Sequence, residues 1–285
     1  MQNGTGLELV LNAAEGALQI IVTEDERLIC VQEWHKADRA TEILAPALAE
    51  ICSSLGIKPA DFRRIACVRG PGSFTGIRLV LTTAAALRRV GQARLAGLDY
   101  MQALATSAVL QHNLFYGTPV WVLTHARRNL VHCQPFMSYG PQIPAQPTQA
   151  VDLCAPQEAL RRIEAAQGAP LPDGTDKHRR THICGSGLAR NADVFAALEG
   201  MRMVPVGEET DSPFAMPRLV CPNTDSLCLL ARHGDYFDAD VEPLYVRPCD
   251  AVENLPQLAP RMGMTGEHAV AALDTMLERS PKSEI

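Results

Sequence analysis

The sequence lacks a basic surplus, paired-cysteine spacings and long apolar runs. Lys and Arg number 26 against 32 Asp and Glu, so the formal net charge is -6. A chain that grips nucleic acid by itself usually carries a basic surplus or a basic stripe. The nine cysteines are scattered, mostly within apolar runs, and none form a C-x-x-C spacing. This disfavours a disulfide framework and indicates a reducing, cytoplasmic compartment.

Targeting and membrane segments are also missing from the pattern. No basic segment followed by an apolar core opens the chain, which predicts no signal peptide. No run approaches the roughly 18 apolar residues of a membrane span. What is present is a globular composition, with 47% apolar and 20% charged residues in 285 positions. That length suffices for one large domain or two small ones.

The first hundred residues predict a mixed sheet with helices. Three apolar runs separated by turn residues predict an antiparallel meander of strands at 7–12, 17–23 and 28–34. Helical periodicity then predicts a helix at 41–55, and an alanine-rich stretch predicts a second helix at 73–90. Short apolar runs predict strands at 65–69 and 95–98. Thr41 or Asp38 is expected to cap the first helix and Gly56 to end it. This order is that of half of an actin-like, ribonuclease H-like fold.

The rest of the chain repeats strands and helices around polar loops. The predicted helices are 100–114, 155–167, 188–199, 224–233 and a loosely attached 267–278. The predicted strands are 120–124, 130–136 and 182–184, with a loop at 140–149. We therefore expect a first lobe at 1–110, a second lobe at 111–250 and a tail at 251–285.

A glycine-rich loop between strand 65–69 and the following helix is the most informative segment. It runs Gly70-Pro71-Gly72-Ser73-Phe74-Thr75-Gly76-Ile77-Arg78. Its glycines allow positive φ and close approach, Ser73 or Thr75 could cap the helix, and free N–H groups there could bind an anion. The residues alone fit either a tight, capped turn or an anion or partner site. The spacing is neither a Walker loop nor a Rossmann fingerprint.

The same nine residues resemble the signature of the TsaB (YeaZ) family. Two weaker similarities fall in the right order, Glu42-Ile-Leu-Ala-Pro46 upstream and Pro243-Leu-Tyr-Val-Arg247 with Asp250-Ala251 near the end. The resemblance spans about residues 7 to 251. It implies a two-lobed α/β fold of the actin-like, ribonuclease H-like (ASKHA) superfamily.

The resemblance also implies a role as a non-catalytic partner. TsaB-like proteins form a heterodimer with TsaD, which transfers threonylcarbamoyl to adenosine at position 37 of tRNA, and the ATPase TsaE joins the pair. The chain would then contact tRNA only indirectly and no membrane. Carried over, the contact helices are 41–55 and 73–90, which is consistent with the second helix being apolar around much of its circumference. The implied partner-binding residues are Ile43, Leu44, Ala47, Leu48, Ile51, Ser73, Phe74, Thr75, Ile77, Arg78, Val80, Leu81 and Ala84. Without the resemblance, burial of that helix inside a single chain is the preferred interpretation.

Catalytic residues of the superfamily are replaced in this sequence. Where relatives carry an early Asp, this chain has Asn12, a weaker ligand for a hard metal ion. His125 stands where the family has Asp at the start of the second lobe. His178 and His182 have an H-x-x-x-H spacing but span a loop and a strand start, so we expect no metal site. His125 and His132 are expected to be solvated beside a hairpin, and Ser73 has no evident His and Asp partners for a nucleophile.

Two further interpretations stay open from the sequence. The glycines of two strand-to-helix turns could contact a nucleotide or anion: Gly70, Gly72, Gly76, Gly185 and Gly187. The only cofactor this would imply is weakly bound ATP or ADP at the partner interface. An acetate- or sugar-kinase-like phosphotransferase is the alternative function, which Asn12 disfavours. The same helix pair could also self-associate as a homodimer when the chain is alone.

Overall fold

The computed structural model describes residues 6–35, 39–167, 181–196, 214–215, 218–246, 259–263 and 265–266. The chain consists of two units, Met1–Leu244 and Tyr245–Ile285. Within the second unit a short 3-10 helix, η2, covers Ala259–Met262. The helix predicted at 267–278 lies outside the described residues. In the described part, none of the helices is long and apolar enough to cross a membrane.

The first sheet contains five strands in the order β3-β2-β1-β4-β5. The strands are β1 (Leu7–Asn12), β2 (Ala17–Glu24), β3 (Arg27–His35), β4 (Arg64–Gly70) and β5 (Arg94–Asp99). β1, β2 and β3 pair antiparallel, whereas β4 and β5 are parallel to β1. The central strands are almost entirely buried and the edge strand β3 is mostly not. The predicted meander and parallel crossovers are confirmed.

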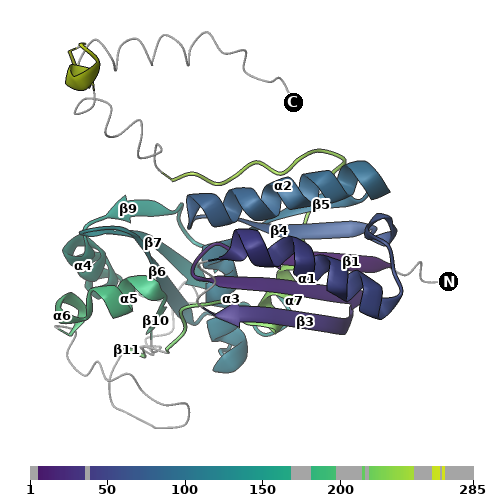
Figure 1. The fold of residues 1–285 in the computed structure, drawn as a ribbon. Coiled ribbons are helices and arrows are strands. Elements are labelled where there is room, and N and C mark those ends of the chain that lie inside the picture. Colours follow the sequence, from purple (N-terminus) through teal and green to yellow (C-terminus); the bar gives the residue numbers. More distant parts are fainter. Residues whose placement is uncertain are drawn as a thin grey trace. The chain divides into compact units, whose positions relative to one another are not determined.

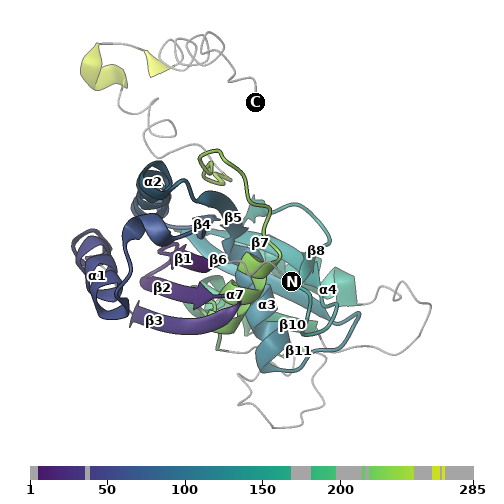
Figure 2. The same ribbon diagram turned by 90° about the vertical axis from the view of Figure 1, so that its right-hand side faces the viewer.

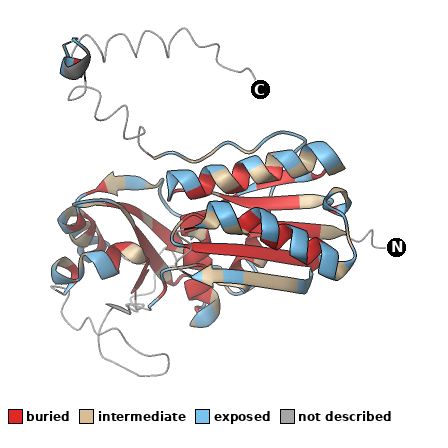
Figure 3. Ribbon diagram, in the orientation of Figure 1, coloured by how far each residue is buried: buried red, intermediate tan, exposed pale blue. Residues whose placement is uncertain are grey.

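Helices cover both faces of this sheet (Figure 2). α1 (Ala40–Leu55) and α2 (Phe74–Gly91) lie on one face. α3 (Tyr100–Gln111) and α7 (Thr224–Arg232) lie on the other, and α3 also contacts the second sheet. A 3-10 turn, η1 (Pro59–Asp61), precedes β4. The outer faces of α1 and α2 are mostly exposed, as the burial colours of Figure 3 show.

The ends of α1 and α2 follow local chemistry. Gly56 ends α1 in the left-handed conformation, as predicted. Arg39 is its N-cap without a side-chain bond, so Thr41 is not the cap, and Asp38 lies outside the described residues. Pro46 lies inside α1 on its exposed side. Ser73 caps α2, because its Oγ accepts the Gly76 N–H at 3.3 Å.

The second sheet has the order β11-β10-β6-β7-β8, with β9 also paired to β7. Its strands are β6 (Pro119–Arg127), β7 (Leu130–Met137), β8 (Gln146–Pro147), β9 (Asp152–Cys154), β10 (Thr181–Cys184) and β11 (Phe214–Ala215). Alternate residues of β6 face opposite sides. Val120 and Val122 join the core shared with the first lobe, and Trp121 and Leu123 join a second core. The second core is covered by α4 (Pro156–Gln167), α5 (Ser186–Arg190) and α6 (Ala192–Phe195) (Figure 1).

Three expectations for the second half need correction. The predicted loop at 140–149 contains β8, and β9 follows it unpredicted, because strands this short carry no readable period. The predicted helix 188–199 is broken into α5 and α6 at Asn191, and residues 197–199 lie outside the described part. α7, expected in the second lobe, packs instead against β1 and β5 of the first sheet.

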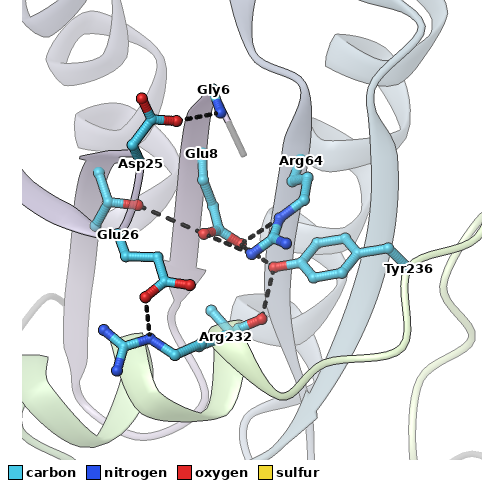
Figure 4. Close-up of polar contacts among 9 residues, drawn as sticks. Gly6, Glu8, Asp25, Glu26, Arg64, Arg232 and Tyr236 are labelled. Carbon is cyan, nitrogen blue, oxygen red and sulfur yellow. Dashed lines mark hydrogen bonds and ion pairs between the residues drawn. The ribbon is translucent and has the colours of Figure 1, made fainter. Parts of the chain in front are cut away.

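A buried ionic cluster fastens the segment after α7 to the first sheet (Figure 4). Glu8 in β1 is 3% exposed, and its carboxylate accepts from Arg64 of β4 at 3.0 to 3.2 Å. The Tyr236 hydroxyl donates to Glu8, and its oxygen also lies 3.0 Å from the Ala231 carbonyl oxygen. Arg64 also lies 4.3 Å above the Tyr236 ring. A neighbouring hollow of about 10 Å³, near Glu26 and Arg232, has room for one water at most.

Candidate functional site

The glycines of the 70–76 loop permit close packing of two turns. A Cβ on Gly72 would lie 2.3 Å from the Ala14 carbonyl oxygen, and one on Gly76 would lie 1.9 Å from that of Ala13. Gly70 has φ +122°, in the region that favours glycine. Gly72 and Gly76 therefore bring the loop against the β1–β2 turn, where a Cβ would collide with backbone.

Several N–H groups that an anion would need at this turn are already bonded within the chain. Ser73 N–H donates to the Ala14 carbonyl at 2.5 Å, and Gly76 N–H donates to Ser73 Oγ. Ala14 N–H donates to Asn12 Oδ1 at 3.0 Å. These contacts favour the capped turn over the anion site that Gly70, Gly72 and Gly76 left open.

The second glycine turn has the same character. Cβ atoms on Gly185 and Gly187 would lie 2.1 and 2.9 Å from the Leu123 carbonyl oxygen. Gly185 N–H donates to the Leu219 carbonyl at 2.8 Å. Close helix-to-strand packing therefore accounts for both glycines, and nucleotide contact there stays a prediction.

Asn12 is a structural connector at the end of β1. Its Nδ2 donates to Gln19 Oε1 at 2.6 Å, and Gln19 Nε2 donates to Glu33 Oε1 at 2.9 Å and to the Pro222 carbonyl at 2.8 Å. Asn12 is only 1% exposed. Its amide is thus engaged in tying β1, β2 and β3 to the segment that leads into α7.

Most of the predicted partner-contact residues on α1 and α2 face inward. They pack in the core that the two helices share with the first sheet: Leu44, Ala47, Leu48, Ile51, Ile77, Val80, Leu81 and Ala84. Ile43 is half-buried against the same core. Side chains buried against their own sheet offer little surface to a partner, so partner contact at those positions stays a prediction. Ser73, Phe74, Thr75 and Arg78 are exposed.

The outward residues of these helices form the surface that a partner could reach. On α1 they include Ala45, Pro46 and Ala49, and on α2 they include Thr82 and Ala86. Phe74 is 45% exposed at the start of α2, where the Arg78 guanidinium lies 4.0 Å from its ring. We call the residues Ala45, Pro46, Ala49, Phe74, Arg78, Thr82 and Ala86 the helix-pair face. The i, i+3 and i+4 spacing opposite the buried stripe is the sequence signal for it.

A polar junction between the lobes has no equivalent in the sequence analysis. Glu15, in the β1–β2 turn, accepts from Ser186 Oγ of α5 at 2.9 Å. Ser186 Oγ in turn accepts the His125 N–H of β6 at 2.9 Å. Burial raises the pKa of Glu15 from 4.5 to about 7, against the smaller opposing effects of Ser186, Arg190, the Tyr100 hydroxyl and the His125 N–H.

The histidines differ from their expected solvated state. His132 is buried, and its Nδ1 lies 3.2 Å from Thr124 Oγ1. His125 is partly buried, which lowers its pKa below the usual 6.5. His178 lies outside the described residues. Among the residues that the structure describes, no three His, Cys, Asp or Glu side chains gather as a metal site would require.

Comparison with known proteins places this geometry in a family. Residues 35–204, more than half of the chain, match the family described as TsaD: tRNA N6-adenosine threonylcarbamoyltransferase. No curated protein sequence matches the chain significantly.

Two solved structures from Pseudomonas aeruginosa share the fold. One is described as an uncharacterized protein with similarity to peptidase YEAZ. It is 17% identical over 85% of this chain and 100% of its own length, with a TM-score of 0.63. The other is YeaZ, 17% identical over 84% of this chain and 99% of its own, with a TM-score of 0.60. The predicted α/β fold is thereby confirmed, and it is the fold of YeaZ. The chain therefore belongs to the TsaD family of tRNA N6-adenosine threonylcarbamoyltransferase proteins, with the fold of its TsaB (YeaZ) type.

Proposed function

We propose that this chain is the non-catalytic partner subunit that binds and activates TsaD in threonylcarbamoyladenosine modification at position 37 of tRNA. The observation that carries the proposal is the helix-pair face. It begins at the family-like loop 70–78 and lies on two adjacent helices whose inner sides are already buried. TsaE and tRNA join through the complex.

The chemistry of the helix-pair face suits a second protein. Its central side chains are small, Ala45 and Ala49 on α1 with Thr82 and Ala86 on α2, so a partner helix could approach closely. Phe74 at one end supplies a large apolar contact, of the kind enriched at interface cores. Arg78 beside Phe74 adds a cation that an acidic partner group could meet.

The contacts of Asn12 support a non-catalytic role. Near the end of β1, a phosphotransferase of this superfamily would need ligands for a magnesium ion and free N–H groups that donate hydrogen bonds to phosphate. Asn12 instead bonds to Gln19 and to Ala14 N–H, and the Ser73 N–H is held by the Ala14 carbonyl. ATP turnover by the purified chain alone would favour the phosphotransferase instead.

Activation is proposed to be allosteric. Docking on the helix-pair face would stabilise the active conformation of TsaD, and a differential contact of about 1–3 kcal/mol suffices for such coupling. The same face could pair two copies of this chain when TsaD is absent. TsaD would then compete with the second copy, and the measured mass of the chain with and without TsaD would separate the two assemblies.

Charged substitutions on the helix-pair face test the proposal. Ala49→Arg on α1 and Ala86→Arg on α2 place a large cation where both helices are exposed, so the fold should be kept. We expect each to weaken TsaD binding at least about tenfold by calorimetry, which corresponds to 1.4 kcal/mol. Threonylcarbamoyl transfer to tRNA by the mixture should fall in parallel.

The matched control is Ala189→Arg, which makes the same change at an exposed position of α5 in the second lobe. It should leave TsaD binding unchanged. Equal TsaD affinity for the two helix variants, the control and the unaltered chain would overturn the proposal.

A further inference from the structure

The polar junction joins elements that belong to different sheets. Glu15 lies in the turn between β1 and β2, Ser186 begins α5, and His125 lies in β6. The Ser186 hydroxyl bonds on both sides, accepting from His125 N–H and donating to Glu15 Oε1. The Glu15 carboxyl therefore holds a first-lobe turn against the second lobe.

The junction is incompletely satisfied. In the described part of the chain, Glu15 Oε2 and His125 Nδ1 are both buried without a hydrogen-bond partner. A buried polar atom without a partner is costly, and far more so when it carries charge. The ionised carboxylate is thus the less favourable form at this place, and the neutral acid is favoured.

The other titratable groups around Glu15 do not change their protonation state near neutral pH. Burial raises the pKa of Tyr100 on α3 well above 10 and that of the Cys221 thiol to about 12, so both stay neutral. Burial and Arg190 lower the pKa of His125 below 6.5. Arg190 on α5 is the cation near Glu15. Glu15 is the group in this set whose charge changes around pH 7.

We propose that Glu15 is a proton-operated latch between the two lobes. Protonated, its carboxyl stays at Ser186 and holds the β1–β2 turn against α5. When the proton leaves for water, the charged carboxylate moves out to solvent, and the junction between the turn, α5 and β6 opens. The inference rests on the contacts of the junction and is independent of the proposed TsaD partner.

The size of the effect follows from linkage. The closed junction holds the proton with a pKa of about 7, and an open junction would restore the ordinary value of 4.5. Because the closed state binds the proton more tightly, rising pH favours the open state. With these two values, the opening constant rises about tenfold between pH 6 and pH 8.

Hydrogen exchange of the full chain, followed by mass spectrometry, tests the latch. Exchange is measured at pH 6, 7 and 8 in peptides covering residues 13–16, 119–127 and 181–190. Each rate is corrected for the intrinsic pH dependence of amide exchange. We expect opening at these peptides to increase about tenfold from pH 6 to pH 8 in the unaltered chain.

Three variants identify the group responsible. Glu15→Gln, which is always neutral, should stay protected at every pH, and Ser186→Ala should open readily even at pH 6. Glu24→Gln changes an exposed acid at the end of β2 and should keep the full pH step. The latch is overturned if the unaltered chain shows no step, or if the step survives in Glu15→Gln, which would assign it to a group such as His125.

Discussion

At the scale of single residues, glycine packing decides how the loop before α2 meets the β1–β2 turn. The Ala13 carbonyl oxygen occupies the place where a Cβ of Gly76 would stand. A methyl group at Gly76 must displace either the backbone of α2 or that of Ala13, because no flexible side chain lies there to move away. The glycine pattern alone indicated that close approach was allowed, but not which segment approaches.

Gly76→Ala is therefore expected to destabilise the protein by about 3 kcal/mol, at the upper end of overpacking costs. The measurement is the free energy of unfolding in urea. Thr75→Ala, one position earlier with an exposed side chain, should change it by less than about 0.5 kcal/mol. If the two variants were equally stable, the packing of the two turns described here would be wrong.

Glu15 marks the limit of sequence reasoning at this scale. The sequence shows only an acid beside a glycine in a turn, which is typical of a solvated position. Its pKa depends on Ser186 and Arg190, more than 170 positions away in the chain. Only tertiary packing brings these groups together.

At the scale of elements, α2 shows what local chemistry can establish. Its start near Ser73, its length and its alanine-rich, proline-free interior were all predictable, and of the two expected caps, Ser73 and Thr75, the structure has Ser73. Which side of the helix faces the sheet was less readable, because apolar and small residues surround most of it. The contact residues were therefore assigned to the buried side.

We expect Ser73→Ala to cost about 1 kcal/mol of unfolding free energy, because the Gly76 N–H loses its acceptor. Ser73→Asp should retain most of that stability, since its carboxylate can accept the same bond and suits the positive helix end. Urea unfolding of both variants at pH 7 provides the check. A loss in Ser73→Asp as large as in Ser73→Ala would show that the cap contributes nothing.

At the scale of the whole molecule, the chain returns to its first sheet after building the second. α7 and the Tyr236 segment pack on β1 and β5, and the Glu8–Arg64–Tyr236 cluster fastens them (Figure 4). The three side chains come from β1, from β4 and from the segment after α7, so no local pattern links them. The expected second lobe at 111–250 included α7 because no local pattern indicates that the chain returns to the first sheet.

Arg64→Met is expected to destabilise the protein by about 3–5 kcal/mol, because it leaves the Glu8 carboxylate buried without its cation. Adding Glu8→Gln to that variant should recover much of the loss, since the uncompensated charge is then removed. Urea unfolding of the single and double variants measures both effects. A double variant less stable than Arg64→Met alone would contradict the stated role of the pair.

The sequence by itself determined the elements of the first lobe and the candidate caps of the helix after the glycine loop, because these depend on neighbours a few positions apart. Hydrophobic periodicity, caps and turn residues act within one helix or strand, so they can be recognised from the sequence. Tertiary structure alone decided which faces of α1 and α2 stay exposed, where α7 packs and that Glu15 meets Ser186. Those outcomes depend on burial and charge contacts between distant segments, which one-dimensional order does not specify.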